Sequence, residues 1–437
     1  MLSRITQNIR CIFELLFYFK RLIENLRFYI KAERRTALIM NSFLGKFSDG
    51  EKTILKLLVE NETMTKNDII KKYDVKLTTL NRMMDSLLER KIVKVVGEAE
   101  STGGRKPRIY SLDDENFYLI GIDISGTRAN IVITNLKMKM LAQEKFPLKP
   151  NSLPEDAINR IKLIVDKHIL NLNIKKENLI GIGVGSIGPI NMEDGTYGNI
   201  EYFNNKSWCG FPLKKTLENI FHLPVLIDNG VNTAVLGEYL LGNGKGDKNI
   251  AYFNCGTKLA SGFISNGIIL RGKVDRADSF SHQIVNFQGD KCECGNYGCV
   301  ATYSSIPAIT KKYMNLCKLN NLDFKINTSG SISFSDICAK ANKEDSLCIS
   351  VIKEASSALA IGIYNYINLL HPDIIILNGP IIRNINVFFD MVKEALSKRN
   401  KDISTKVEII KGGIFKDNEI AISAALMFFI KNIYEID

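Results

Sequence analysis

The sequence predicts an α/β protein in which a small, basic, mainly helical module precedes a larger body of two α/β lobes. A length of 437 residues exceeds what one hydrophobic core usually supports. Beyond residue 117 the chain alternates strand-like and helix-like stretches to its end. Residues 1–111 hold 22 Lys and Arg against 13 acids, a net +9 of the total +11. The basic module is therefore distinct from a nearly neutral body.

Composition narrows the class of protein. A hydrophobic content of 45% and a charged content of 24% are typical of a soluble globular chain. No run reaches the ~18 to 20 apolar residues that span a bilayer, and no cleavable signal peptide is evident, so we expect a cytoplasmic protein. The basic module favours a polyanion as partner, either nucleic acid or an anionic membrane surface. The alternative is a merely solvated lysine-rich surface.

Residues 1–45 are expected to form an amphipathic helix that dimerises or docks. Their apolar residues alternate in steps of three and four, the seam spacing of a short coiled coil. The seam consists of Ile9, Ile12, Leu16, Phe19, Ile23, Leu26 and Ile30. Membrane-surface binding and a partly disordered leader are the alternatives.

Residues 46–113 are expected to form three short helices followed by two strands. The first helix places Ile54, Leu57 and Leu58 on one face. The second begins with Thr65 and Asp68, a capping-box pattern with Asp in place of Glu. The third has an apolar side made of Leu80, Met83, Met84, Leu87 and Leu88. Three helices and a two-stranded wing indicate a winged helix-turn-helix.

The third helix of this module carries the residue types of a recognition helix. Such a helix enters the major groove by its first turns, where short polar and cationic side chains belong. The wing carries an "STGGRKPR" turn whose cations suit phosphates or the minor groove. We expect DNA contacts from Lys76, Thr78, Thr79, Asn81, Arg82, Arg105, Lys106 and Arg108. A winged helix that docks on protein is the alternative.

Residues 114–437 are expected to form two α/β lobes with a cleft between them. Strand-like stretches of the first lobe lie in 118–136, 178–190 and 223–228, and a helix follows the last one. A β-hairpin around "GTKLASG" and a late buried strand, "DIIILNG", belong to the second lobe. The stretch "GIGVGSIGP" is expected to be a buried strand that runs into a glycine-rich loop.

At this point the chain resembles the ROK family of repressors, open reading frames and sugar kinases, over roughly residues 50–435. The stretches that carry the resemblance are "ESTGGRKPR", "GIDISGT", "GIGVGSIGP", "DNGVNTAVLGE", "GTKLASG", "SHQIVNFQGDKCECGNYGC" and "HPDIIILNG". The resemblance implies an actin-like, ribonuclease H-like ATPase fold for the body. With the winged module in front, it implies the repressor branch, similar to xylose-type and N-acetylglucosamine-type regulators.

A cluster of cysteines predicts a metal site. His282, Cys292, Cys294 and Cys299 supply one imidazole and three thiolates, a closed set that suits structural zinc. Free cysteines or a redox pair are the alternative. The remaining cysteines are scattered in apolar settings and are expected to be reduced. In the family this zinc lies next to the sugar pocket, and the imidazole of the ligand His approaches the sugar.

The resemblance also implies that kinase chemistry has been lost. The family's catalytic base is the Asp that follows Glu-Asn, and here Gly230 follows Asp228 and Asn229. Asp228 is one residue early and is expected to point to the other side of an extended segment. The phosphate-binding loops are altered as well, with Ser125, Lys258 and Ala260 in place of glycines. We expect no catalysis.

The implied sugar pocket is changed too. Ser279 and Ala301 replace two sugar-binding Glu residues, while Asn204, Asn229 and His282 remain as candidate ligand-binding residues. We expect a DNA-binding transcriptional regulator of carbohydrate-related genes, acting as a repressor. Its expected partners are an operator, a sugar or sugar-derivative effector, and a second copy in a homodimer or a dimer of dimers. A sugar kinase with a DNA-binding appendage and a regulator controlled by a partner protein are the alternatives.

Overall fold

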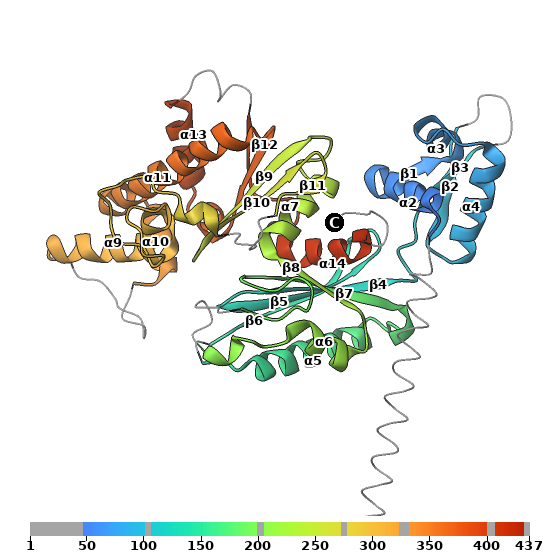
Figure 1. Cartoon of the computed structure of the whole chain (residues 1–437), viewed down its shortest axis with the longest axis horizontal. Coiled ribbons are helices and arrows are strands. Elements are labelled where there is room, and N and C mark those ends of the chain that lie inside the picture. The colour runs from blue at the N-terminus through green and yellow to red at the C-terminus, as the bar shows by residue number, and fades with distance from the viewer. Residues whose placement is uncertain are drawn as a thin grey trace, which may run out of the picture.

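The computed structural model of the chain describes residues 47–100, 106–149, 151–198, 205–271, 278–322, 332–399 and 407–431. Figure 1 shows a small N-terminal module beside two larger α/β lobes, with helices α7 and α14 between the two lobes. The amphipathic helix predicted for residues 1–45 lies outside the described residues, and so does the "STGGR" turn at 101–105.

The N-terminal module combines three helices with a small antiparallel sheet. The helices are α2 (Asp49–Asn61), α3 (Lys66–Lys72) and α4 (Leu77–Glu89), and the sheet order is β1 (Thr63–Thr65), β3 (Arg108–Leu112), β2 (Val93–Glu98). The sequence predicted the three helices and the β2–β3 pair. It missed β1, because three residues are too short to show an alternating pattern.

Side-chain caps fix where the first two helices begin. Ser48 and Glu51 form a capping box at α2, and the box predicted from Thr65 and Asp68 is confirmed at α3. Helix α4 has no such cap, because the side chain of Lys76 makes no capping hydrogen bond. The first amides of α4 therefore lack a side-chain acceptor from the N-cap residue.

The buried face of the module agrees with the predicted helical periodicity, with small differences. Leu80, Met83, Met84 and Leu87 of α4 are buried as predicted, whereas Leu88 is only half-buried. On α2, Leu55 and Val59 join Ile54 and Leu58 in the core, and Leu57 is half-buried. The buried stripe of α2 is displaced because this helix packs against β1 and β3 of its own module and also against α7 of the body.

The first lobe is a five-stranded sheet with helices on both faces. The strand order is β6 (Met140–Pro147), β5 (Arg128–Asn135), β4 (Tyr118–Ile124), β7 (Leu179–Ser186), β8 (Val225–Asn229). Strands β4, β7 and β8 are parallel, and β5 and β6 are antiparallel. Helices α5 (Pro154–Asn171) and α6 (Leu213–Phe221) lie on the outer face in Figure 1. The short 3-10 turns η1 (Lys176–Asn178) and η2 (Lys206–Trp208) complete the connections.

The second lobe repeats this plan with the same strand order and the same parallel and antiparallel pairs. Its sheet runs β11 (Ile268–Ile269), β10 (Leu259–Ser265), β9 (Asn249–Cys255), β12 (Ile374–Asn378), β13 (Glu408–Lys411). Its helices are α8 (Ala301–Ser304), α9 (Ile306–Leu319), α10 (Phe334–Ala341), α11 (Ser346–Leu370), α12 (Pro380–Asn384) and α13 (Phe388–Ser397). The 3-10 turn η3 (Ser279–His282) precedes the cysteine loop, and η4 (Lys416–Asn418) leads into α14 (Glu419–Lys431).

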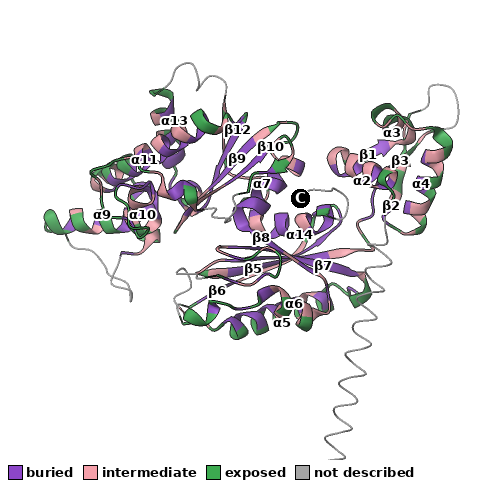
Figure 2. Cartoon of the chain, viewed as in Figure 1, coloured by how far each residue is buried: buried purple, intermediate pink, exposed green. Residues whose placement is uncertain are grey.

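Helices α7 (Gly230–Leu241) and α14 fill the space between the two sheets. Helix α7 contacts β9 and β10 of the second lobe as well as β7 and β8 of the first. Figure 2 shows both helices largely in the colour of buried residues. The close approach of α14 to the first sheet requires glycine: a Cβ on Gly183 would lie 1.7 Å from the carbonyl oxygen of Ala424. The glycines of "GIGVGS" therefore lie within strand β7 and allow α14 to pack closely on it; they do not form a loop.

Within the described residues, α11 alone is long and apolar enough to meet the length and composition of a membrane span. Its most apolar window is 56% buried inside the second lobe, as in the core helix of a globular domain. We therefore interpret α11 as a core helix.

Candidate metal centre and ligand cleft

His282 and the three clustered cysteines come together in one group at the start of the second lobe. Their four ligand atoms all lie within 4.8 Å of one another. The Nδ1 atom of His282 is 3.5 Å from the Sγ of Cys292, and the Sγ atoms of Cys294 and Cys299 are 3.7 Å apart. A disulfide needs about 2.05 Å between sulfurs, so this pair is not one.

The loop that carries the cysteines is held by its own backbone. Cys292 donates its N–H to Asn296 at 2.7 Å, and Cys299 lies in a bridge with Ile284. Gly298 has φ +67°, and a Cβ there would lie 1.5 Å from the carbonyl oxygen of Asn286. Only glycine fits at this position. The backbone conformation of the loop therefore holds the three cysteine sulfurs close together.

The geometry of the cluster fits a tetrahedral metal ion. Zinc–sulfur bonds of ~2.3 Å and zinc–nitrogen bonds of ~2.0 Å give edges of about 3.8 Å between two sulfurs and about 3.5 Å between sulfur and nitrogen. The two distances above agree with these edges. Burial and the neighbouring thiols raise the pKa of Cys299 to about 12. Burial also opposes ionisation of Cys294, but hydrogen bonds from Asn296 and the other thiols outweigh it and lower the pKa of Cys294. A bound cation is what would hold all three sulfurs as thiolates.

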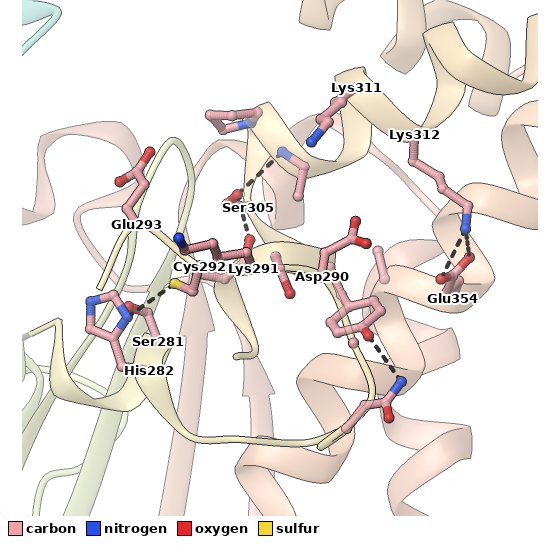
Figure 3. A pocket seen from close by; sticks show the side chains of 18 of the residues that line it. Ser281, His282, Asp290, Lys291, Cys292, Glu293, Ser305, Lys311, Lys312 and Glu354 are labelled. Carbon is pink, nitrogen blue, oxygen red and sulfur yellow. Dashed lines mark hydrogen bonds and ion pairs between the residues drawn. The ribbon is translucent and has the colours of Figure 1, made fainter. Parts of the chain in front are cut away.

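Two cavities meet beside this loop. The first, of about 570 Å³, is the cleft between the lobes, and Asn229 and Gly230 line it. The second, of about 450 Å³, lies on the metal side, and His282, Ala301 and Lys311 are among its lining residues. Figure 3 shows His282 and Cys292 turned toward each other on one side, with Lys312 and Glu354 paired on the other. The structure thus places Asn229 and His282 in adjacent but separate cavities; Asn204 lies outside the described residues.

The ion pair between Lys258 and Glu293 lies where the two cavities adjoin. Lys258, in the β9–β10 turn, donates to the carboxylate of Glu293, which lies between two of the metal-cluster cysteines. Both residues line both cavities. The pair therefore connects the β9–β10 turn to the loop that carries the cysteines, and it narrows the passage between the cleft and the second cavity.

Gly230, which the family resemblance aligns with the catalytic base, lies at the start of a helix. Gly230 is the first residue of α7, and the Oδ1 of Asn229 caps it by accepting the N–H of Val231 at 3.3 Å. Asp228 does not line the cleft. Its carboxylate accepts hydrogen bonds from Arg271, from the backbone of Asn229 and from the amide of Asn232. Asp228 is therefore already engaged by other groups and is not among the residues that line the cleft.

The cleft carries a charge cluster that motif comparison alone did not reveal. Asp417, at η4, accepts from Arg128 at 3.3 Å, from Arg383 at 2.8 Å and from Lys145. Burial opposes ionisation of Asp417, but these cations outweigh it and lower its pKa. Burial raises the pKa of nearby Asp123 to about 6. Arg128 and Asp417 are 289 residues apart, so no local pattern could have paired them.

A second carboxyl at the cleft has a raised pKa. Burial, together with the negative charge of Glu238, raises the pKa of Glu419 well above its ordinary value. Because a raised pKa favours the neutral form of Glu419, the four cations of the lining, Arg128, Lys258, Arg383 and Lys416, are balanced by less negative charge. The cleft is suited to a polar or anionic ligand.

Most of the predicted DNA-contact residues lie at the surface of the N-terminal module. Lys76, Thr78 and Arg82 of α4 are exposed, and so are Lys106 and Arg108 at the start of β3. Thr79 and Asn81 are half-buried, and Arg105 lies outside the described residues. The Oδ1 of Asn81 accepts a hydrogen bond from Lys66 of α3 at 2.7 Å, so this bond uses the acceptor of Asn81 and not its NH₂ donors.

Comparison with known proteins places the body in a defined group. The model of the ROK family matches residues 119–429. The xylose repressor of Caldicellulosiruptor bescii is 26% identical over 379 residues, which cover 86% of this chain and 94% of the repressor.

Two solved structures share the fold. A ROK family transcriptional regulator, a homologue of the Escherichia coli MLC protein, has a TM-score of 0.72 at 20% identity and covers 88% of this chain and 96% of its own. The ROK family glucokinase of Streptomyces griseus, in complex with glucose and AMPPNP, has a TM-score of 0.60 at 21% identity and covers 71% and 98%. The likeness to the regulator extends over more of this chain.

Proposed function

The chain belongs to the ROK family, and we propose that it is a DNA-binding repressor of carbohydrate-related genes whose kinase-like body receives an effector. One observation carries this proposal. The similarity to a xylose repressor spans 86% of this chain, well beyond the 311 residues of the family match at 119–429, and so takes in residues of the N-terminal module. A cytoplasmic location accords with this role.

The N-terminal module, residues 46–113, is the proposed winged helix-turn-helix. In it α3 and α4 form the helix-turn-helix and β2–β3 the wing. The exposed cations and hydroxyls at the start of α4 support this role, and so does the absence of a side-chain cap there, which leaves amides for phosphate. The proposed contacts are those of the sequence, from Lys76, Thr78, Thr79, Asn81 and Arg82 on α4 and from Arg105, Lys106 and Arg108 on the wing.

The body, residues 114–437, is proposed to bind without catalysing phosphoryl transfer. Such transfer needs a carboxylate base near the sugar hydroxyl. Gly230 has no side chain at that place, and the ion-paired carboxylate of Asp228 lies outside the cleft lining. The side chains of Ser125, Lys258 and Ala260 line the cleft where backbone must approach phosphate.

The metal cluster is proposed to hold one structural zinc through His282, Cys292, Cys294 and Cys299. The complete set of four protein ligands favours a structural role, because a catalytic site keeps one position open. When bound, the metal neutralises the thiolates and fixes the loop that forms one wall of the metal-side pocket.

The effector is proposed to be a sugar or sugar derivative that contacts Asn229 and His282, together with Asn204. Asn229 and His282 line two adjoining cavities, so a ligand that touches both has to displace the Lys258–Glu293 pair. Each partner of this pair is partly solvated, and a surface ion pair is worth ~0–1 kcal/mol. Effector binding can therefore break it at small cost.

The proposed signal passes through α7. Its first residues line the cleft, and its flank packs against α2 of the DNA-binding module. Closure of the lobes around an effector would shift α7 and thereby the position of the module. In the proposed homodimer this changes the distance between two recognition helices and so the affinity for a two-part operator.

Selection of DNA from a random pool by the purified chain, followed by titration of the selected duplex at several salt concentrations, tests the proposal. We expect specific binding that weakens with salt as phosphate contacts are lost. Replacing Arg82 by Ala should weaken it, while the control Lys398→Ala, directly after α13 of the second lobe, should not. Absence of any sequence preference would refute the proposal. Sugar-dependent ATP turnover would instead favour the kinase alternative.

A further inference from the structure

Leu77 is a large apolar residue exposed at the first position of α4. Its side chain is 53% exposed, whereas the other apolar residues of the helix that face the core are buried. It belongs neither to the core of the module nor to the half-buried residues packed on that core. Folding of the chain therefore leaves this side chain in contact with water, which is unfavourable for a leucine.

The surroundings of Leu77 are polar. Thr78 follows it, the cationic Lys76 precedes it, and Asn81 lies one turn further along the same side of the helix. Lys66 already occupies the Oδ1 of Asn81, so Asn81 offers donors only. The first two turns of α4 thus present cations, hydroxyls and amide donors around a single exposed apolar group.

A protein-binding surface would have a different composition. The centre of a protein interface is depleted of charge and enriched in apolar and aromatic groups. In the major groove of DNA, by contrast, acceptors and phosphates surround one apolar group, the 5-methyl of thymine. The arrangement around Leu77 is complementary to that pattern.

We propose that Leu77 contacts the 5-methyl group of a thymine in the operator and thereby specifies a T·A pair in each half-site. This inference rests on the proposed DNA binding and adds to it the base that α4 reads by apolar contact. Arg82 and Thr78 can then make polar contacts with the DNA on either side of this thymine.

The test compares duplexes that differ only in that methyl group. The selected operator is synthesised with thymine or with deoxyuridine at each T position in turn, and binding is titrated for four chains. Wild type should lose affinity about fourfold at one position per half-site, the worth of one buried methyl. Leu77→Ala should bind both duplexes equally, Leu77→Met should keep part of the discrimination, and Leu163→Ala, 69% exposed on α5 of the body, should keep all of it.

The outcomes separate this inference from the function on which it rests. If wild type shows no sequence preference at all, the proposed function fails and the inference with it. If wild type binds specifically but Leu77→Ala keeps the full fourfold discrimination, the inference alone is overturned. It is equally overturned if Leu77→Ala leaves DNA binding unchanged and alters the oligomeric state, since Leu77 would then cover a protein contact. Circular dichroism of each variant verifies that it is folded.

Discussion

Asp228 illustrates what a single residue reveals only in three dimensions. The sequence predicts that its side chain points away from the base position, because neighbouring residues of a strand alternate. Accordingly, Asn229 lines the cleft and Asp228 does not. The partner that holds it, Arg271, comes from a segment 43 residues away, and no motif links the two. Periodicity predicts the direction of a side chain but not the identity of a distant contact.

Asp123 should make stability depend on pH. Burial raises its pKa in the folded chain to about 6, from an ordinary value of 3.8. Between these two values the unfolded chain ionises first, so folding free energy is lost as pH rises and no further loss follows above about 6. Asp123→Asn removes this loss. Its stability relative to wild type should increase by about 2.4 kcal/mol from pH 4 to pH 7.

Urea unfolding at several pH values measures this difference, since the other titrating groups cancel between the two chains. Exposed Asp49→Asn provides the matched control and should show a constant difference. A pH-independent difference for Asp123→Asn as well would contradict the assigned pKa.

Two glycines of the metal loop should respond very differently to alanine. Both have positive φ, which costs an alanine ~1–2 kcal/mol. At Gly295 the new Cβ meets nothing within 4 Å, whereas at Gly298 it collides with the backbone of Asn286. We expect Gly298→Ala to lose bound zinc and Gly295→Ala to retain it. Metal content per chain, measured after gel filtration, distinguishes the two; equal retention would show that the loop can adjust.

At the scale of elements, the sequence was most informative where a pattern is local. The capping box at Thr65 and Asp68 and the buried stripe of α4 were predicted, because each depends on residues within one or two turns. Strand β1 was missed, since its pairing with β3 joins residues 48 positions apart, such as Thr63 and Ser111. The partition of the cleft by Lys258 and Glu293 was missed for the same reason.

The packing of α14 on β7 should tolerate no side chain at Gly183. A methyl group there would lie 1.7 Å from the carbonyl oxygen of Ala424, so the helix would have to move away from the sheet. Gly183→Ala should cost several kcal/mol, at or above the ~1–3 kcal/mol of ordinary overpacking. Gly97→Ala in β2, where nothing lies within 4 Å, is the control. Thermal unfolding measures both, and equal melting temperatures would rule out this packing.

At the scale of the whole molecule, Arg383 bridges the lobes. It lies on α12 of the second lobe and donates to Asp417, at the start of the helix that packs on the first sheet. Arg383→Ala should cost ~1.5–3 kcal/mol, the worth of a hydrogen bond to a charged group, and should speed hydrogen exchange in η4 and the first turn of α14. Lys312→Ala, which breaks an exposed pair within the second lobe, should leave exchange there unchanged. Unaltered exchange in both variants would show that the lobes are held by other contacts.

The contact between α2 and α7 has a consequence for any measurement on this protein. Two ligands that bias the same helix are thermodynamically linked, and the coupling is reciprocal: whatever factor the effector imposes on operator affinity, the operator imposes on effector affinity. Copies seated on DNA would then respond at a different effector concentration from copies free in solution. The dissociation constant of the effector measured on the chain without DNA would therefore differ from the effector concentration at which the regulated gene responds. The effector affinity should be measured both with and without the operator.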